Sequence, residues 1–248
     1  MRTANPTLSN KTFEQFRGFS IEQSNTMTLQ GTVFKSMILL AFCVGTAIIS
    51  WGQMLSNPQL AIPLAIGGGI GGLIFALITS FKMQWASVTG PLYAICEGVF
   101  LGAISCTFEM RFPGIVINAV MLTFGTFGCL LAAYTSGLIK PSENFKLGIA
   151  AATGGIFMLY MANIVLGFFG IPIPFIHGTG LIGIGFSAFV VVIAALNLVL
   201  DFDFIEEGVE NGAPKYMEWY ASFALMVTLV WLYLEILRLL AKLQSRDD

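Results

Sequence analysis

Seven apolar stretches constrain the fold of this chain more than any other feature. A helix needs about 20 apolar residues to cross a bilayer core, and stretches of that length recur here between short segments that carry Pro, Asn, Ser or charge. Charged residues make up 10% of the chain, compared with about 25% in a typical soluble domain. The predicted spans cover residues 33–53, 59–80, 88–108, 114–139, 147–170, 179–202 and 219–241.

These spans predict an all-α integral membrane protein built as a seven-transmembrane-helix bundle. We expect residues 1–32 to form a polar cytoplasmic N-terminal segment, residues 33–241 the seven-helix membrane domain, and residues 242–248 a charged C-terminal tail. The polar start does not have the pattern of a cleavable signal peptide. At 248 residues, one compact bundle is expected rather than two domains.

The distribution of Lys and Arg predicts the orientation, because cytoplasmic segments carry an excess of both. With the N-terminus inside, eight of the 12 basic residues lie on the cytoplasmic side, and the basic tail beyond the seventh span is the exception. The connection at residues 171–177, "IPIPFIH", is apolar and rich in proline, so we expect it in the membrane interface. The eight basic residues on the predicted cytoplasmic side are Arg2, Lys11, Arg17, Lys35, Lys82, Lys140, Lys146 and Lys215.

Other conspicuous motifs indicate packing rather than chemistry. The glycine-rich stretch at residues 65–75 lacks the Lys-Ser or Lys-Thr of a phosphate loop, and small residues let membrane helices approach closely. Residues 124–137 and 148–155 are interpreted in the same way. His177 alone cannot form a His-rich metal site, no cofactor is expected, and no basic patch suggests nucleic acid. The cysteines are expected to be small buried hydrophobic residues: Cys43, Cys96, Cys106 and Cys129.

Acids inside the apolar spans are the main functional candidates. A charged residue at the bilayer centre costs about 2.5–3.5 kcal/mol on insertion scales, so it is rare without a function. Three acids qualify: Glu97, Asp201 and Glu235. Glu109 and Glu218 lie at predicted helix ends and are expected to face water.

Asp201 opens a run of acids at the end of the sixth span. Asn197 lies one turn earlier on the same helix face, so the two residues predict a polar stripe that points into the bundle. Asp203 is rotated by about 200° from Asp201, so the two cannot face one pocket together. The last acids of the run are expected in water: Glu206 and Glu207.

Depth separates the other two acids. Glu97 lies roughly 13 Å above the inner boundary, with Tyr93 one turn earlier on its face. It is either a hydrogen-bonded acid within the bundle or a site that faces an aqueous pocket. Glu235 lies about 24 Å up, near the outer boundary, and Arg238 three residues on predicts a peripheral ion pair. Depth therefore favours Glu97 as the partner of Asp201.

Two carboxyl groups that lie close together in a low dielectric cannot both ionise cheaply. Asp201 and Glu97 therefore predict either a proton-sensitive latch or a cation site. Calcium favours several such oxygens, so transient calcium at these two residues is the metal interaction that we consider.

Three stretches stand out together in the third, sixth and seventh spans: "PLYAICEGVFLG", "LNLVLDFDFIEEG" and "WYASFALMVTLVWLYLEILRLLAKL". They resemble the Bax inhibitor family, also called the transmembrane Bax inhibitor motif family. The N-terminal "NPTLSNKTF" is similar to a bacterial branch of that family. The resemblance covers all seven predicted spans.

The resemblance implies a seven-helix membrane protein associated with pH-sensitive calcium leak and, in eukaryotes, with suppression of cell death. The family's sixth helix carries a Tyr-Asp pair, and here Leu200 and Asp201 occupy those places. In the family a second aspartate in helix seven pairs with the first and gates a pore. Alignment on "ILRLL" places Thr228 at that second position, which leaves Glu97 as the substitute to test first.

The leading functional hypothesis is therefore a pH-sensitive cation leak channel, with calcium first, in a bacterial inner membrane. The alternative is a non-conducting membrane regulator that binds other membrane proteins, such as a quality-control protease. No enzyme is expected. An intramembrane aspartyl protease needs two aspartates on different helices, and Asp201 has no aspartate partner in another predicted span. The gate or ion pathway is assigned to Asp201, Glu97, Asn197, Thr228 and Tyr93, with Asp203 and Glu235 as secondary candidates. The expected partners are the lipid bilayer, calcium or other cations, and membrane proteins.

Overall fold

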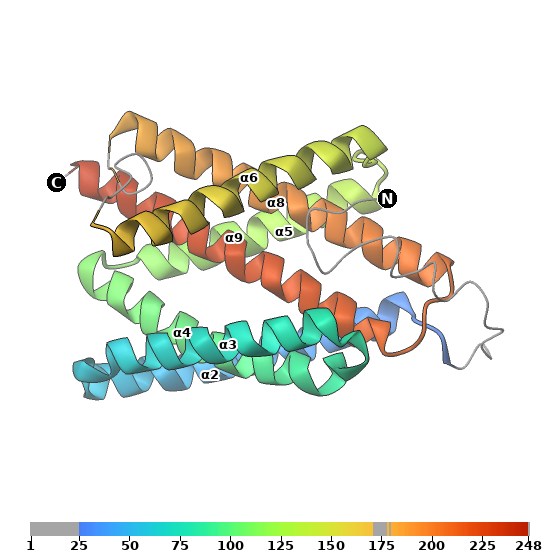
Figure 1. The fold of residues 1–248 in the computed structure, drawn as a ribbon, viewed down its shortest axis with the longest axis horizontal. Helices are drawn as coiled ribbons and strands as arrows, with labels where there is room; N and C mark the ends of the chain where they lie inside the picture. Colours follow the sequence, from blue (N-terminus) through green and yellow to red (C-terminus); the bar gives the residue numbers. More distant parts are fainter. Residues whose placement is uncertain (1–24, 171–177, 179, 248) are drawn as a thin grey trace. The chain divides into compact units, whose positions relative to one another are not determined.

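Seven long helices make up almost all of the computed structural model, which describes residues 25–170, 178 and 180–247 (Figure 1). Each is long and apolar enough to cross a membrane, and no strand occurs in the described residues. The predicted all-α seven-span fold is confirmed. The helices are α2 (Leu29–Ser56), α3 (Ala61–Phe81), α4 (Ala86–Arg111), α5 (Ile115–Thr135), α6 (Glu143–Phe168), α8 (Leu181–Glu210) and α9 (Met217–Asp247), with short 3₁₀ turns at Pro58–Leu60 and Met83–Trp85.

Local capping explains where the first helix starts and where the sixth ends. Thr28 is the N-cap of α2, and its hydroxyl accepts a hydrogen bond from the amide of Gly31 at 3.1 Å. Helix α8 continues past residue 202 to Glu210, and Gly212 follows with a φ of 64° that suits a residue without a Cβ. The connection at residues 171–177, which includes His177, lies outside the described residues.

The seventh helix extends beyond its predicted end. Residues 242–247, which belong to the expected charged tail, continue α9 as helix. Lys242 is buried, and its ammonium group donates to the carbonyl of Gly183 at 3.1 Å and to the hydroxyl of Ser187 at 2.8 Å. The charge of Lys242 therefore has partners on α8, so the helix has no need to end where the apolar run stops.

The described residues form two compact units, and each is described by itself. Unit A contains residues 114–202 and 228–247, and unit B contains residues 25–113 and 203–227, without the gaps stated above. Helices α8 and α9 each pass from one unit to the other within their length. The single bundle expected from chain length stays a prediction.

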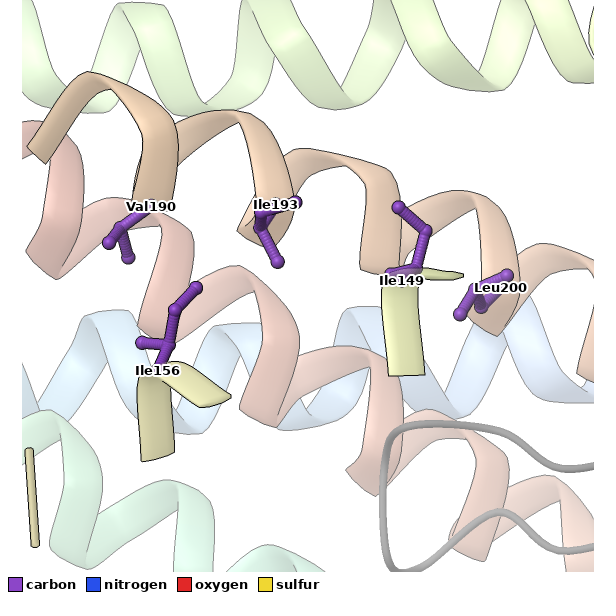
Figure 2. Close-up of a cluster of buried hydrophobic side chains, with 5 residues drawn as sticks. All are labelled: Ile149, Ile156, Val190, Ile193 and Leu200. Carbon is purple, nitrogen blue, oxygen red and sulfur yellow. The ribbon is translucent and has the colours of Figure 1, made fainter. Parts of the chain in front are cut away.

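An aliphatic cluster joins α6 and α8 in unit A. Figure 2 shows Ile149 and Ile156 of α6 pointing toward α8, where the other members lie. Tyr160, Phe186 and Trp231 pack against this cluster. Packing of this kind drives helix association in lipid, because lipid tails are as apolar as leucine. The α8 members are Val190, Ile193 and Leu200.

Glycines hold α2, α3 and α4 together in unit B. A Cβ on Gly68 of α3 would lie 2.6 Å from the backbone nitrogen of Phe100 on α4. A Cβ on Gly98 of α4 would collide with the carbonyl of Cys43 and the hydroxyl of Thr46 on α2. The predicted packing role of the stretch at residues 65–75 is confirmed at Gly68, where the backbone of α4 approaches that of α3.

The other two small-residue stretches do not pack in this way. A Cβ on Gly125 or Gly128 of α5, or on Gly154 of α6, would meet nothing within 4 Å in the described part of the chain. The prediction of close packing at residues 124–137 and 148–155 is wrong for these glycines. Their side of each helix is open within unit A, and an exposed glycine needs no partner because it has no side chain to satisfy.

The cysteines divide in the same way. Cys43 and Cys106 are buried, as predicted, and Cys96 is half-buried. Cys129 is exposed on α5, so the prediction is wrong for this residue. All four thiols are free. A thiol is only weakly polar, so its exposure on an apolar helix costs little.

Candidate functional site

Asp201 of α8 is a deeply buried acid. Its side chain is 2% exposed. It shares a side-chain hydrogen bond with Thr228 of α9, while its Oδ2 atom has no hydrogen-bond partner among the described residues. A carboxylate has about four acceptor positions. A single hydroxyl therefore leaves most of this acceptor capacity unused in a buried place, which is costly if the group is charged.

The partner of Asp201 in unit A is thus a hydroxyl rather than a second acid. The resemblance on "ILRLL" placed Thr228 at the position of the family's second aspartate, and the structure brings its side chain to Asp201. Both residues lie at the end of unit A, because α8 leaves the unit after Phe202 and α9 enters it at Thr228. The bond therefore joins the two continuous helices at the level where both pass between units.

Asn197 extends the polar stripe by one turn. Its amide nitrogen donates to the hydroxyl of Thr153 on α6 at 2.8 Å and to the carbonyl of Ile193 at 2.8 Å. Asn197 and Asp201 are both buried, so the predicted inward-facing stripe is confirmed. Thr153 was missed by sequence reasoning. The available signal was a hydroxyl in an otherwise apolar span, but threonines often bond their own helix backbone instead.

Replacing Thr228 by valine tests the bond to Asp201, because valine keeps the shape and removes the hydroxyl. We expect a loss of about 1–3 kcal/mol in the free energy of unfolding, since a buried acceptor loses its donor. Thr228→Ser keeps the hydroxyl and is the matched control. Unfolding by sodium dodecyl sulfate in mixed micelles measures both variants. Equal stability of the valine and serine variants would show that the bond contributes nothing.

Glu97 lies in unit B, on the side of α4 that faces α3. Its Oε2 atom lies 2.6 Å from the position that a Cβ on Gly72 would occupy. Glu97 is half-buried, and Tyr93 one turn earlier is buried with its ring edge-on to Phe223 at 5.0 Å between centroids. The carboxylate thus occupies space left by a glycine. Asp201 belongs to the other unit, so its pairing with Glu97 stays a prediction.

Glu235 forms the predicted ion pair. Arg238 Nη1 lies 2.9 Å from Glu235 Oε1 and donates to Oε2 at 3.0 Å. Tyr160 of α6 completes the group: its hydroxyl donates to Glu235 at 2.9 Å and accepts from Arg238 at 2.8 Å. The carboxylate of the pair is buried, since the Glu235 side chain is 2% exposed, and its depth near the outer boundary stays a prediction. The tyrosine lies on another helix, and no local spacing indicates it.

Glu218 overturns one expectation. The sequence placed it in water at the start of α9, but its side chain is 0% exposed. Its carboxylate binds Lys35 of α2 and lies 2.8 Å from the ammonium group of Lys215. Thr28 donates to Glu218 Oε1 from its amide at 2.9 Å and from its hydroxyl at 2.8 Å. The start of α9 is buried against the start of α2, a tertiary contact that sequence spacing does not reveal.

The remaining acids of α8 agree with the prediction only in part, because Glu207 was expected in water. Glu206 is exposed, as predicted, whereas Asp203 and Glu207 are half-buried. Within the described residues, no group of three or more His, Cys, Asp or Glu side chains is arranged to hold a metal ion. Any cation at Asp201 would therefore be held with hydroxyl, amide or carbonyl oxygens, which suits transient passage better than tight binding.

Seven apolar helices with buried polar groups between them define a helical integral membrane protein. The chain belongs to the Bax inhibitor 1 like family, whose model matches residues 5–245. Comparison with curated proteins and with solved structures found no match. The family assignment thus rests on a match that spans nearly the whole chain.

Proposed function

We propose that this protein is a pH-sensitive cation leak channel, with calcium as the first cation to test, and that Asp201 is its gate. One observation carries the proposal: the buried Asp201 carboxyl has a single side-chain partner, and its second oxygen has none among the described residues. Intramembrane acids that face the protein interior mark ion and proton pathways. The bacterial inner membrane and a cytoplasmic N-terminus belong to the same proposal.

Protonation of Asp201 changes the strength of the contact between α8 and α9. The ionised carboxylate accepts a charge-assisted hydrogen bond from Thr228, and such bonds are roughly twice as strong as neutral ones. The neutral acid holds the same hydroxyl more weakly. Acidification therefore loosens α8 from α9 at this level, because the added proton occupies a carboxyl oxygen and removes the negative charge that strengthens the bond from Thr228.

Calcium flux into liposomes tests the gate. Purified protein should pass calcium faster at acidic pH, and Asp201→Asn should lose most of this pH response because asparagine cannot ionise. Glu210→Gln, which neutralises an exposed acid of the same helix, is the control and should behave as the parent protein. A variant Asp201→Asn with an unchanged pH profile would remove Asp201 from the gate.

Glu97 has its own test in the same assay. If Glu97 is the electrostatic partner of Asp201, Glu97→Gln should shift the pH at which flux rises, since a charged neighbour changes the free-energy cost of ionising Asp201. An unchanged profile would leave Asp201 and Thr228 as the gate and remove Glu97 from it.

The absence of flux at every pH would overturn the channel and favour the second function, a non-conducting regulator. In that case the protein would act by binding other membrane proteins, such as a quality-control protease, rather than cations. We propose no enzymatic activity in either case. Cross-linking in native membranes then identifies the partner, and the same flux data decide between the two functions.

A further inference from the structure

A buried carboxylate ties the start of α9, and the turn that precedes it, to the start of α2 in unit B. Glu218 at the start of α9 accepts from the amide and hydroxyl of Thr28, binds Lys35 of α2, and pairs with Lys215 of the α8–α9 turn. The Glu218 carboxylate packs tightly against α2, because a Cβ on Gly31 would collide with it. We call these five residues the Glu218 clasp.

Backbone contacts reinforce the same junction. The amide of Met27 donates to the carbonyl of Ala213 at 2.6 Å, and the amide of Lys215 donates to the carbonyl of Asn25 at 3.0 Å. Further along both helices, the hydroxyl of Ser222 donates to the carbonyl of Thr32 at 2.9 Å. The segment that precedes α2 is therefore hydrogen-bonded to the α8–α9 turn, and the clasp lies among these hydrogen bonds.

The members of the clasp differ in burial, and Glu218 and Lys35 form its buried core. Glu218 is 0% exposed and Lys35 is 14% exposed, whereas Lys215 is 44% exposed. Removing one member of a buried ion pair leaves the other charge buried without its partner, which is strongly unfavourable. Lys35 also lies over the Trp219 ring, 5.5 Å from its centroid, so displacement of the lysine disturbs the first turn of α9 as well.

The clasp lies where α8 ends and α9 begins, so it constrains the ends of both helices. Both helices begin or end at the clasped turn and run without a break to Asp201 and Thr228. We propose that the Glu218 clasp is a conformational lock, which seats the ends of α8 and α9 and thereby keeps the Asp201–Thr228 contact closed. The lock is a property of the fold that holds whether or not the protein conducts ions.

Hydrogen exchange on the full chain in lipid nanodiscs tests the lock. Two variants open it differently: Glu218→Gln removes the charge, and Gly31→Ala displaces the carboxylate without changing any charge. Both should raise exchange about tenfold or more at residues 25–36 and 211–222, because local opening sets the exchange rate. Exchange at residues 196–204 and 224–231, around Asp201 and Thr228, should rise as well.

Matched controls separate the lock from general effects of substitution. Glu210→Gln neutralises an exposed acid of α8, and Gly45→Ala adds a Cβ to α2 where nothing lies within 4 Å among the described residues. Both should exchange like the parent protein. Lys215→Gln removes the most exposed member and serves as a milder variant if Glu218→Gln does not fold; it should show the same pattern at smaller amplitude.

Each outcome decides the proposal. Faster exchange confined to residues 25–36 and 211–222 would reduce the clasp to a local anchor and overturn the lock. Unchanged exchange in all clasp variants would overturn the clasp itself. The readout does not use ion flux, so a protein that fails to conduct calcium contradicts the proposed channel and leaves this test intact.

Discussion

Replacing Arg238 by methionine should destabilise the protein by about 3 kcal/mol, because it leaves the buried Glu235 carboxylate without its charged partner; this is the lower end of the range for a buried pair, since Arg238 itself is 37% exposed. Glu235 is 2% exposed and receives two hydrogen bonds from the guanidinium group. The hydroxyl of Tyr160 remains as a donor, but one neutral donor does not compensate for a lost cation. The free energy of unfolding in mixed detergent micelles measures the effect.

The control for Arg238→Met removes the stranded charge as well. In the double variant Glu235→Gln with Arg238→Met, the amide keeps an acceptor for Tyr160, and most of the lost stability should return. Replacement of both members of a buried ion pair is often close to neutral. If the single and double variants are equally unstable, packing of the arginine stem accounts for the loss rather than the uncompensated carboxylate.

Gly98→Ala should be the second large effect, with a loss of about 3 kcal/mol from overpacking. The new methyl group would collide with the carbonyl of Cys43 and the hydroxyl of Thr46. A backbone carbonyl cannot rotate away as a long side chain can, so α2 and α4 must separate. Thermal denaturation in detergent and the free energy of unfolding both report this loss.

Gly67→Ala is the matched control for Gly98→Ala. A Cβ at Gly67 would meet nothing within 4 Å in the described part of the chain. Alanine is the better helix former by about 1 kcal/mol, so this control should be as stable as the parent protein or slightly more so. A loss at Gly67 equal to that at Gly98 would contradict the assignment of close packing to Gly98.

Periodic and local features were predictable from the sequence. The apolar spans predicted the helices, since each span was long enough to cross the bilayer as a helix, which satisfies its own backbone hydrogen bonds in lipid. The pairing of Glu235 with Arg238 followed from three-residue spacing on one helix. The inward face shared by Asn197 and Asp201 followed from helix rotation.

Contacts between distant helices were not predictable in the same way. Glu218 looked like a water-facing residue because its place at a helix start carries no information about what packs against it. Lys35 lies 183 positions earlier in the chain, and its ion pair with Glu218 exists because α2 and α9 start side by side. The glycines of α5 and α6 resembled those of α3, yet within unit A they meet no neighbouring backbone.

The sequence by itself determined that the chain spans a membrane with seven helices, and which acids are costly there, because both depend on length, hydropathy and rotation along one helix. The tertiary structure decided which side chains form hydrogen bonds or ion pairs with those acids. Thr228 bonds Asp201 from the next helix of the chain, whereas Tyr160 bonds Glu235 and Thr28 bonds Glu218 from segments far away in sequence. Such partners depend on which helix faces pack together, and many arrangements of seven apolar helices satisfy the same sequence pattern until side-chain shape and buried polar groups select one.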